Sequence, residues 1–170
     1  AEKFFLNVYL NQDARAEINS HFSFKLKDKD WYTMGLVHGS VNWLKMDFNK
    51  DGFIDNPLFN RFTAMNRWFH VKSDGGMLMI AGSVNFEDRK AGQLSYDFKK
   101  PVNAQQQWGS LLKTKHAELF AKTSFLFEHE STLGIQYKYS YQQQSGFIGR
   151  KELLSQEHFG YINAIYQNEF

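Results

Sequence analysis

Residues Ala14 to Lys27 read ARAEINSHFSFKLK, and this stretch decides the fold class. Its even-numbered positions are mostly apolar, ending in Phe22, Phe24 and Leu26, whereas its odd-numbered positions are polar or charged. Alternation with a period of two residues indicates a β-strand, because successive side chains point to opposite faces of a sheet. The pattern runs over about 14 residues, whereas a strand of a soluble domain usually ends after roughly five or six. A tilted strand that crosses a bilayer needs roughly 9 to 11 residues, so the length favours a membrane strand.

The same alternation recurs along the chain and predicts about eight strands. It is clear over residues 78–86, 117–127, 133–142 and 160–167; the opening segment 4–11 and two less regular stretches, 32–46 and 60–72, complete the count. We expect short polar turns at 27–30, 73–76 and 128–131, and longer loops at about 47–59, 88–113 and 144–156. Short turns at one end and long loops at the other are typical of outer-membrane barrels. The predicted fold is therefore all-β, with antiparallel up-and-down transmembrane β-barrel strands, and residues 1–170 form a single region.

The composition agrees with alternating strands. Phe, Tyr and Trp make up 17% of the residues, yet the mean hydropathy is −0.53. Aromatic residues gather near expected strand ends and predict girdles at the two lipid–water interfaces; these residues are Trp31, Tyr32, Trp43, Trp68, Phe69, Phe125 and Phe127. The net charge is only +2 and no basic run occurs, so we expect no nucleic-acid partner. There is no cysteine, which excludes disulfides and thiol chemistry.

Residues Asp47 to Asp55 read DFNKDGFID and match the first nine positions of a calcium-binding loop. In such a loop alternate side-chain oxygens converge on the ion, the glycine permits a sharp turn and the seventh position offers its carbonyl. The predicted calcium ligands are Asp47, Asn49, Asp51, Phe53 and Asp55. Leu58 stands where the bidentate glutamate would be, and the flanks read as strands. A polar turn without an ion is the alternative interpretation.

No catalytic constellation is apparent. The six histidines (His21, His38, His70, His116, His129 and His158) show no zinc-ligand spacing, and no serine nucleophile motif occurs. We therefore expect neither an enzyme nor a cofactor other than calcium. The polar rows of two expected strands are mixed in sign and predict a lumen-facing surface; they comprise Arg15, Glu17, Asn19, His21, Lys25, Gln136, Lys138 and Gln142. Mixed polar rows suit both a water-filled pore and a wall around a plug.

The run from Asp47 to Val71, DFNKDGFIDNPLFNRFTAMNRWFHV, resembles the barrel of TonB-dependent receptors from Bacteroidetes-type bacteria. In that family an Asp/Asn-rich loop leads into a strand that ends in an M-N-R-W motif, here residues 65–68. Residues 85–93, NFEDRKAGQ, are similar to the family's D-R-x-x-G-Q element, and 161–167, YINAIYQ, to one of its barrel strands. The resemblance covers most of the chain from about Phe5 onward and is nearest to receptors for vitamin B12 or siderophores.

The resemblance implies a barrel of about 22 strands with a plug domain inside. It implies import of a scarce small-molecule nutrient across the outer membrane, with energy supplied through the TonB complex, and contact with membrane lipid or lipopolysaccharide. It also adds weight to calcium at the Asp-rich loop. The chain departs from the family because no plug domain or TonB-box segment is recognisable. We therefore expect it to be part of a longer polypeptide.

Two other interpretations remain open. About eight strands would also make a small closed outer-membrane barrel with a structural or adhesive role. A soluble lipocalin-like barrel that binds a ligand has a similar strand number, with its apolar rows pointing inwards. Pairing of residues 4–11 with 158–168 would close the sheet and exclude a segment of a larger barrel.

Overall fold

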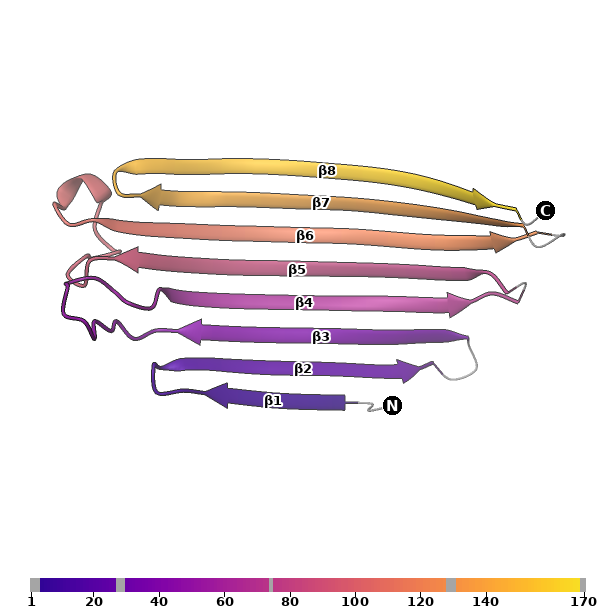
Figure 1. Cartoon of the computed structure of the whole chain (residues 1–170), viewed down its shortest axis with the longest axis horizontal. Coiled ribbons are helices and arrows are strands. Elements are labelled where there is room, and N and C mark those ends of the chain that lie inside the picture. Colours follow the sequence, from indigo (N-terminus) through magenta and orange to yellow (C-terminus); the bar gives the residue numbers. More distant parts are fainter. Residues whose placement is uncertain (1–3, 27–29, 74, 128–130, 169–170) are drawn as a thin grey trace.

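The computed structural model is one antiparallel sheet of eight strands in sequence order (Figure 1). It describes residues 4–26, 30–73, 75–127 and 131–168. The strands are β1 (Phe4–Leu10), β2 (Arg15–Lys25), β3 (Trp31–Asn42), β4 (Leu58–Val71), β5 (Met77–Gly92), β6 (Gly109–Leu126), β7 (Thr132–Ile148) and β8 (Lys151–Gln167). A short 3-10 helix, η1 (Val102–Ala104), lies between β5 and β6. The predicted all-β, up-and-down arrangement is confirmed. No helix in the described ranges is long and apolar enough to cross a membrane, a finding that bears on helices alone.

The strands follow the alternation that predicted them, but the later ones are longer than expected. The β5 strand has 16 residues, β6 has 18, and β7 and β8 have 17 each. The β2 strand is shorter than the alternating stretch, because Ala14 has a φ of 59° and belongs to the preceding turn. In that turn the Asn11 side-chain oxygen accepts hydrogen bonds from the backbone N–H groups of Asp13 and Arg15.

The connections are sorted between the two ends of the sheet, with one correction. Short connections join β2 to β3, β4 to β5 and β6 to β7 at one end, the turn end; residues 27–29, 74 and 128–130 of the predicted turns lie outside the described residues. At the other end, the loop end, long loops occupy residues 43–57 and 93–108, near the expected positions. The predicted long loop at 144–156 is wrong. There β7 and β8 continue to Ile148 and from Lys151 around a two-residue turn, in which Gly149 has a φ of 58°.

Polar composition explains that error. Residues 142–146 read QQQSG and resemble a loop in sequence. They are nevertheless held in the ladder by both neighbours, for example Gln143 by Lys115 and by Gln156. A strand needs an apolar side chain only where one of its faces is dry, so a polar run can extend a strand into water.

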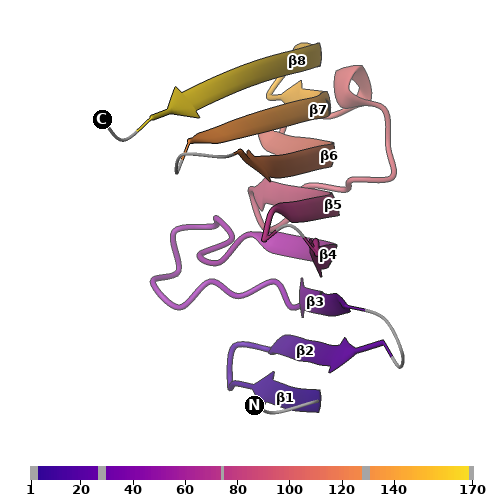
Figure 2. The same ribbon diagram turned by 90° about the vertical axis from the view of Figure 1, so that its right-hand side faces the viewer.

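The sheet is a single layer without a covering layer on either face (Figures 1 and 2). Its accessible surface is 11793 Å², whereas a compact soluble protein of this mass exposes roughly 8,700 Å². In the described part of the chain the buried hydrophobic residues are Ile54 and Tyr96, and both lie in the long loops. The strands β1 and β8 are edges, and neither pairs with the other, so the sheet is open rather than closed into a barrel.

Candidate functional site

The register divides the side chains of the sheet between two contrasting faces, since directly paired residues of antiparallel strands point the same way. We call the first the apolar face. It carries Ile18, Phe22 and Phe24 of β2, Phe62, Ala64 and Trp68 of β4, Leu78, Ile80, Val84 and Phe86 of β5, Ala117, Leu119, Ala121 and Phe125 of β6, and Leu133, Ile135, Tyr137, Tyr139 and Tyr141 of β7. Many of these side chains are exposed, and Ile162 on the same face of β8 is 73% exposed.

The apolar side chains form a band of nearly constant length, the apolar band. It spans residues 78–86 in β5, 117–125 in β6 and 133–141 in β7. Each span is about nine residues, close to the roughly 9 to 11 that cross a bilayer in a tilted strand. Within these spans no Asp, Glu, Lys or Arg points to the apolar face. Charges follow directly at the loop end, with Asp88 beyond Phe86 and Lys115 beyond Ala117.

The band runs obliquely to the strands. One row of paired residues joins Leu10 and Ala16 at the β1 side to Asp88 and Lys113 near the middle of the sheet. At the turn-end limit of the band, Phe125 of β6 pairs with Leu133 of β7. This pair lies one position beyond Met77, the first residue of β5, which pairs with Ser124. A row perpendicular to the strands thus leaves the band as it crosses the sheet. Strands inclined to the band are what a barrel wall requires, because barrel strands tilt by roughly 35–45° from the axis.

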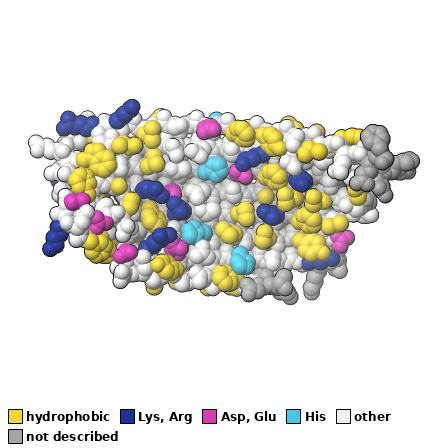
Figure 3. Space-filling model, viewed as in Figure 1, with side chains coloured by type: hydrophobic (Ala, Val, Ile, Leu, Met, Phe, Trp, Pro, Cys, Tyr) yellow, Lys and Arg dark blue, Asp and Glu magenta, His cyan; other side chains and the backbone are white. Residues whose placement is uncertain are grey.

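The other face, the polar face, carries the charged side chains of the strands' central portions. Basic, acidic and histidine side chains are interspersed with hydrophobic ones in Figure 3. The two rows expected from sequence to share a face do so, because the register links them across β3 to β6; they comprise Arg15, Glu17, Asn19, His21, Lys25, Gln136, Lys138 and Gln142. The aromatic girdle residues divide between the faces. Trp31 and Trp68 lie on the apolar face, whereas Tyr32 and Phe69 pair on the polar face.

An arginine cluster occupies the loop end of the polar face. The Arg61 Nε donates a hydrogen bond to Glu87 Oε2 over 2.9 Å, and a terminal nitrogen of Arg89 lies 2.8 Å from Glu87 Oε1. Arg15 forms an ion pair with Glu17 beside it. The Phe59 ring lies between two of these guanidinium groups, at 5.8 Å from Arg15 and 5.9 Å from Arg61. The cluster therefore presents three arginines against two glutamates.

A polar row crosses the polar face beside the arginine cluster, toward the turn end. It comprises Asn7, Asn19, His38, Thr63, Asn85, His116, Gln142 and Glu157, one from each strand. His38 Nδ1 lies 2.6 Å from Asn19 Oδ1, and Asn85 Nδ2 donates to Thr63 Oγ1 over 2.8 Å. Such a row can form hydrogen bonds with water, a solute or a covering domain.

The Asp-rich loop folds back on its own backbone. Asp47 accepts hydrogen bonds from the N–H groups of Asp51 and Gly52, at 3.1 and 2.9 Å. Asp55 Oδ2 accepts from Phe48 N over 2.6 Å, and Asp51 Oδ1 from Phe53 N over 2.8 Å. The loop thus brings the carboxylates of the predicted calcium ligands into one turn, where amide donors satisfy them. Among the described residues no group of three or more His, Cys, Asp or Glu side chains has an arrangement that would hold a metal ion. Calcium at this loop stays a prediction.

The two long loops fold against each other at the loop end. Leu94 N donates to Gly52 O and Ile54 N to Gly92 O, over 2.8 and 2.9 Å. Lys45 Nζ reaches the backbone oxygens of Leu94 and Tyr96, at 2.8 and 3.0 Å. The Tyr96 ring is buried, 1% exposed, and burial raises the pKa of its hydroxyl above the ordinary value. Sequence periodicity gave no sign of this small loop core, because it depends on contacts between distant loops.

The histidines are dispersed through the described part of the sheet. His70 stacks on Trp31 with ring centroids 4.7 Å apart, and His158 Nδ1 lies 2.8 Å from the Tyr139 hydroxyl. His116 Nε2 lies 3.7 Å from Glu118 Oε2, while its buried Nδ1 has no hydrogen-bond partner among the described residues. His129 lies outside the described residues.

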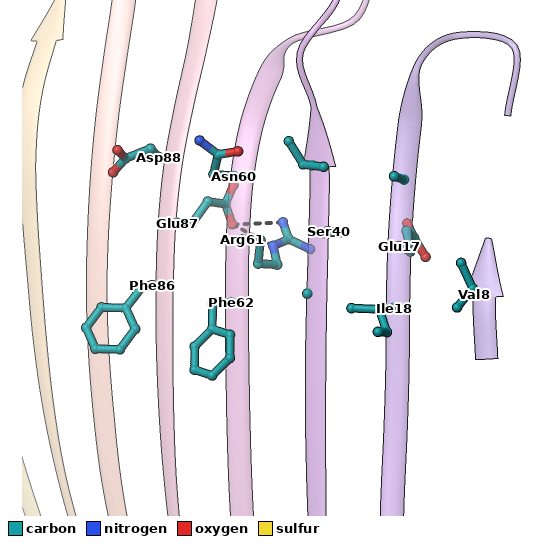
Figure 4. A pocket seen from close by; sticks show the side chains of 13 residues that line it. Val8, Glu17, Ile18, Ser40, Asn60, Arg61, Phe62, Phe86, Glu87 and Asp88 are labelled. Atoms are coloured by element: carbon teal, nitrogen blue, oxygen red, sulfur yellow. Dashed lines mark hydrogen bonds and ion pairs between the residues drawn. The ribbon is translucent and has the colours of Figure 1, made fainter. Parts of the chain in front are cut away.

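A hollow of about 610 Å³ opens at the loop-end limit of the apolar band. Its lining extends from Val8 on β1 to Phe86 on β5. In Figure 4 the rings of Phe62 and Phe86 lie toward the band, while Asn60 and Asp88 lie toward the loops. The hollow is therefore apolar on one side and polar on the other.

Comparisons with known proteins identify no relative: no family model matches the sequence, no curated protein matches it, and no solved structure matches the fold.

Proposed function

We propose that this chain forms part of the wall of a TonB-dependent outer-membrane receptor that imports a scarce nutrient such as vitamin B12 or a siderophore. The observation that supports the membrane part of this proposal is that, within the apolar band, charged side chains lie on only one face of the sheet. Over about nine residues in each of β5, β6 and β7 one face has no Asp, Glu, Lys or Arg side chain. That length matches the roughly 9 to 11 residues of a transmembrane strand.

The environment of the two faces follows from their chemistry. The apolar face exposes large side chains with no layer to cover them. Contact with lipid removes the free-energy cost that such a face would have in water. The polar face, with its arginine cluster and polar row, would line the interior, against water or a plug domain. The loop end would face the cell exterior, since outer-membrane barrels carry their longer loops there.

Further strands must flank the sheet in this proposal. An open edge in hydrocarbon leaves backbone N–H and C=O groups unpaired, which only closure can satisfy. The unpaired edges of β1 and β8 therefore favour a segment of a larger barrel over a closed eight-stranded one. Strands of up to 18 residues also extend well beyond a bilayer, and they favour a large barrel with tall walls.

The receptor class rests on the resemblance of residues 47–71 and 85–93 to TonB-dependent receptors. The structure places these segments next to one another, because β4 pairs with β5 and the Asp-rich loop bridges to Gln93. The candidate calcium ligands (Asp47, Asn49, Asp51, Phe53 and Asp55) would then lie at the outer mouth of the barrel, near the incoming nutrient.

The membrane part of the proposal can be tested with single cysteines, since the chain has none of its own. Val84→Cys on the apolar face and Ser83→Cys on the polar face are neighbours in β5. When the protein that carries this chain is reconstituted in phospholipid vesicles, we expect Val84→Cys to resist a water-soluble maleimide and Ser83→Cys to react. Equal reactivity of both thiols would contradict a lipid-facing apolar band.

The transport part needs a cellular test. The protein that carries this chain would be expressed in cells lacking their own vitamin B12 and siderophore receptors. We expect uptake of one of these nutrients, and loss of uptake when TonB is deleted. Uptake that persists without TonB would indicate a passive pore, and an outer-membrane protein without any uptake would favour a structural role.

A further inference from the structure

A second hollow, which we call the turn-end hollow, lies on the polar face near the turn end and has a volume of about 710 Å³. Its apolar walls are Tyr32 and Met34 of β3, Phe69 of β4 and Met79 of β5. The rings of Tyr32 and Phe69 lie 6.3 Å apart with their planes at 55°. Rings set at an angle and flexible thioethers are surfaces that pack well against a flat aromatic body.

Arg67 lines the same hollow, two residues before Phe69 on β4. Its Nε atom is buried without a hydrogen-bond partner, and its side chain forms no ion pair with the described residues. Nε is the only one of its three nitrogens that is both buried and unpartnered, so the two terminal nitrogens remain accessible. Two parallel N–H donors of this kind match a carboxylate in a bidentate contact.

The other arginines of the described strands do have acidic partners. Their ion pairs are Arg15–Glu17, Arg61–Glu87 and Arg89–Glu87. An exposed lysine without a partner can turn its ammonium group into water, but the buried Nε of Arg67 cannot turn in this way. Water bound in the hollow would find few hydrogen-bond partners on the apolar walls. An anion with an apolar body is therefore a better complement to this site than water.

The charge of the lining singles out a monoanion. Arg67 and Lys25 are the charged residues that line the turn-end hollow, and no Asp or Glu does so. Lys25 is compensated from outside the lining, because its Nζ lies 3.3 Å from Asp30 Oδ1. The hollow at the loop-end limit of the apolar band differs, since its lining includes the acidic residues Glu17, Glu87 and Asp88. One uncompensated guanidinium against apolar walls favours a ligand with a single negative charge.

The backbone that carries Arg67 is held in place from the opposite face. Thr33 is 3% exposed, and its Oγ1 donates a hydrogen bond to the Arg67 carbonyl over 3.1 Å. The same Oγ1 accepts a hydrogen bond from Asn66 Nδ2 over 3.2 Å. A donor group that is already fixed loses less conformational freedom when a ligand binds.

We propose that the turn-end hollow binds an aromatic carboxylate, with the carboxylate against the terminal nitrogens of Arg67 and the ring against Tyr32 and Phe69. This ligand site goes beyond the proposed import function and does not depend on it, because the polar face of the sheet supplies every residue that the contact needs.

Three small probes test the chemistry of the ligand, with the protein that carries this chain in mild detergent and isothermal titration calorimetry as the measurement. We expect 2-naphthoate to bind. The amide 2-naphthamide has the same ring without the charge and should bind about 10- to 100-fold more weakly, since that is the value of hydrogen bonds to a charged group. Octanoate has the carboxylate without the ring and should also bind more weakly.

Each probe has an outcome that would overturn the proposal. Failure of 2-naphthoate to bind would exclude the site. Equal affinity for the amide would exclude the carboxylate contact, and equal affinity for octanoate would exclude the aromatic body. This comparison requires no variant, so it stands even if a substitution in the hollow prevents folding.

Variants place the binding at Arg67. Arg67→Gln should weaken 2-naphthoate binding about 10- to 100-fold, and Arg67→Lys should restore only part of the affinity because an ammonium group lacks the planar fork. Arg150→Gln is the matched control, since it removes the same charge from the exposed turn between β7 and β8. Equal losses in Arg67→Gln and Arg150→Gln would indicate a nonspecific effect of charge and overturn the proposal.

A second pair of variants tests the ring contact. Phe69→Leu removes a ring from the wall of the hollow and should weaken binding of 2-naphthoate more than binding of octanoate. Phe159→Leu makes the same change on the polar face of β8, outside the lining, and should leave both affinities unchanged. Equal effects of the two variants on 2-naphthoate would overturn the placement of the ring.

Discussion

Arg61 and Glu87 stand opposite each other on β4 and β5, joined by a 2.9 Å hydrogen bond, while the next pair along the ladder, Phe62 and Phe86, points to the other face. Moving by one residue along both strands thus leads from an ion pair on the polar face to two paired phenylalanines on the apolar face. The same change of face from one residue to the next recurs across the sheet, as the proposed membrane wall requires.

The Arg61–Glu87 pair should contribute measurably to stability. Glu87 is 17% exposed and Arg61 35%, so solvent screens the pair only in part. A double-mutant cycle with Arg61→Met and Glu87→Gln should give a coupling of about 0.5–1 kcal/mol, measured by urea unfolding in detergent micelles. The cycle Lys25→Met and Asp30→Asn is the control, because that pair is 51% and 71% exposed and its coupling should be near zero. Similar couplings in both cycles would contradict a special role for the arginine cluster.

A charge should be tolerated on one face of β5 and not on the other. Val84→Lys places an ammonium group in the apolar band, where lysine near the middle of a bilayer costs about 2–4 kcal/mol. Ser83→Lys, its neighbour, adds the same charge to the polar face and should cost less than about 1 kcal/mol. Urea titration of the vesicle-inserted protein measures both, with Val84→Ala as the control for the lost side chain. Equal costs for the two lysines would indicate that water covers both faces.

The alternation predicted about eight strands, and it placed the polar rows of β2 and β7 on one face, because successive side chains of a strand point to opposite faces. It failed where apolar residues do not alternate with polar ones, as at Phe147-Ile148 and Leu153-Leu154. Residues 144–148 and 151–156 have no apolar row, so their pairing is decided by the neighbouring strands. The facing of Tyr32 and Phe69 was also missed, since adjacent aromatic residues gave no clue to which of them faces the band.

The site was predictable in part. The turn at the Asp-rich loop was predictable because such a motif is local in sequence, and calcium binding there stays a prediction. The arginine cluster was not, because it joins Arg15, Arg61 and Arg89 from three strands. The hollow at the loop-end limit of the apolar band depends on Gly39 lying between the side chains of neighbouring strands, which only the register reveals. Motifs within one segment can therefore be predicted from the sequence, whereas clusters of side chains from several strands cannot.

Calcium should bind the Asp-rich loop and stabilise it. We expect a dissociation constant in the 10⁻⁴–10⁻³ M range of extracellular sites, and a rise in the melting temperature when calcium is in excess. Asp47→Asn should weaken binding, measured by isothermal titration calorimetry. Asp97→Asn is the control, because Asp97 caps a different turn through the N–H of Lys99. Titration without heat, or the same affinity in both variants, would leave the loop as a self-capped turn.

The loop core should depend on the Tyr96 ring and not on its hydroxyl. The hydroxyl oxygen is buried and has no hydrogen-bond partner in the described part of the chain, so Tyr96→Phe should be neutral or stabilising. Tyr96→Ala removes the whole ring and should destabilise the loops by about 3–5 kcal/mol. Proteolysis of the loops at increasing urea concentration measures both. A Tyr96→Phe variant as unstable as Tyr96→Ala would show that the hydroxyl has an essential partner.

The loop core should also weaken in alkali. Burial raises the pKa of the Tyr96 hydroxyl, so the folded loops hold its proton at a pH at which the unfolded chain releases it. The stability from this group is complete below about pH 10, the usual pKa of tyrosine, and is lost as the pH rises through the folded value. Comparing urea midpoints of wild type and Tyr96→Phe between about pH 9 and pH 11 isolates this group from the other tyrosines. Because phenylalanine has no proton to release, the two midpoints should diverge above about pH 10, and parallel curves would mean that Tyr96 ionises freely in the folded protein.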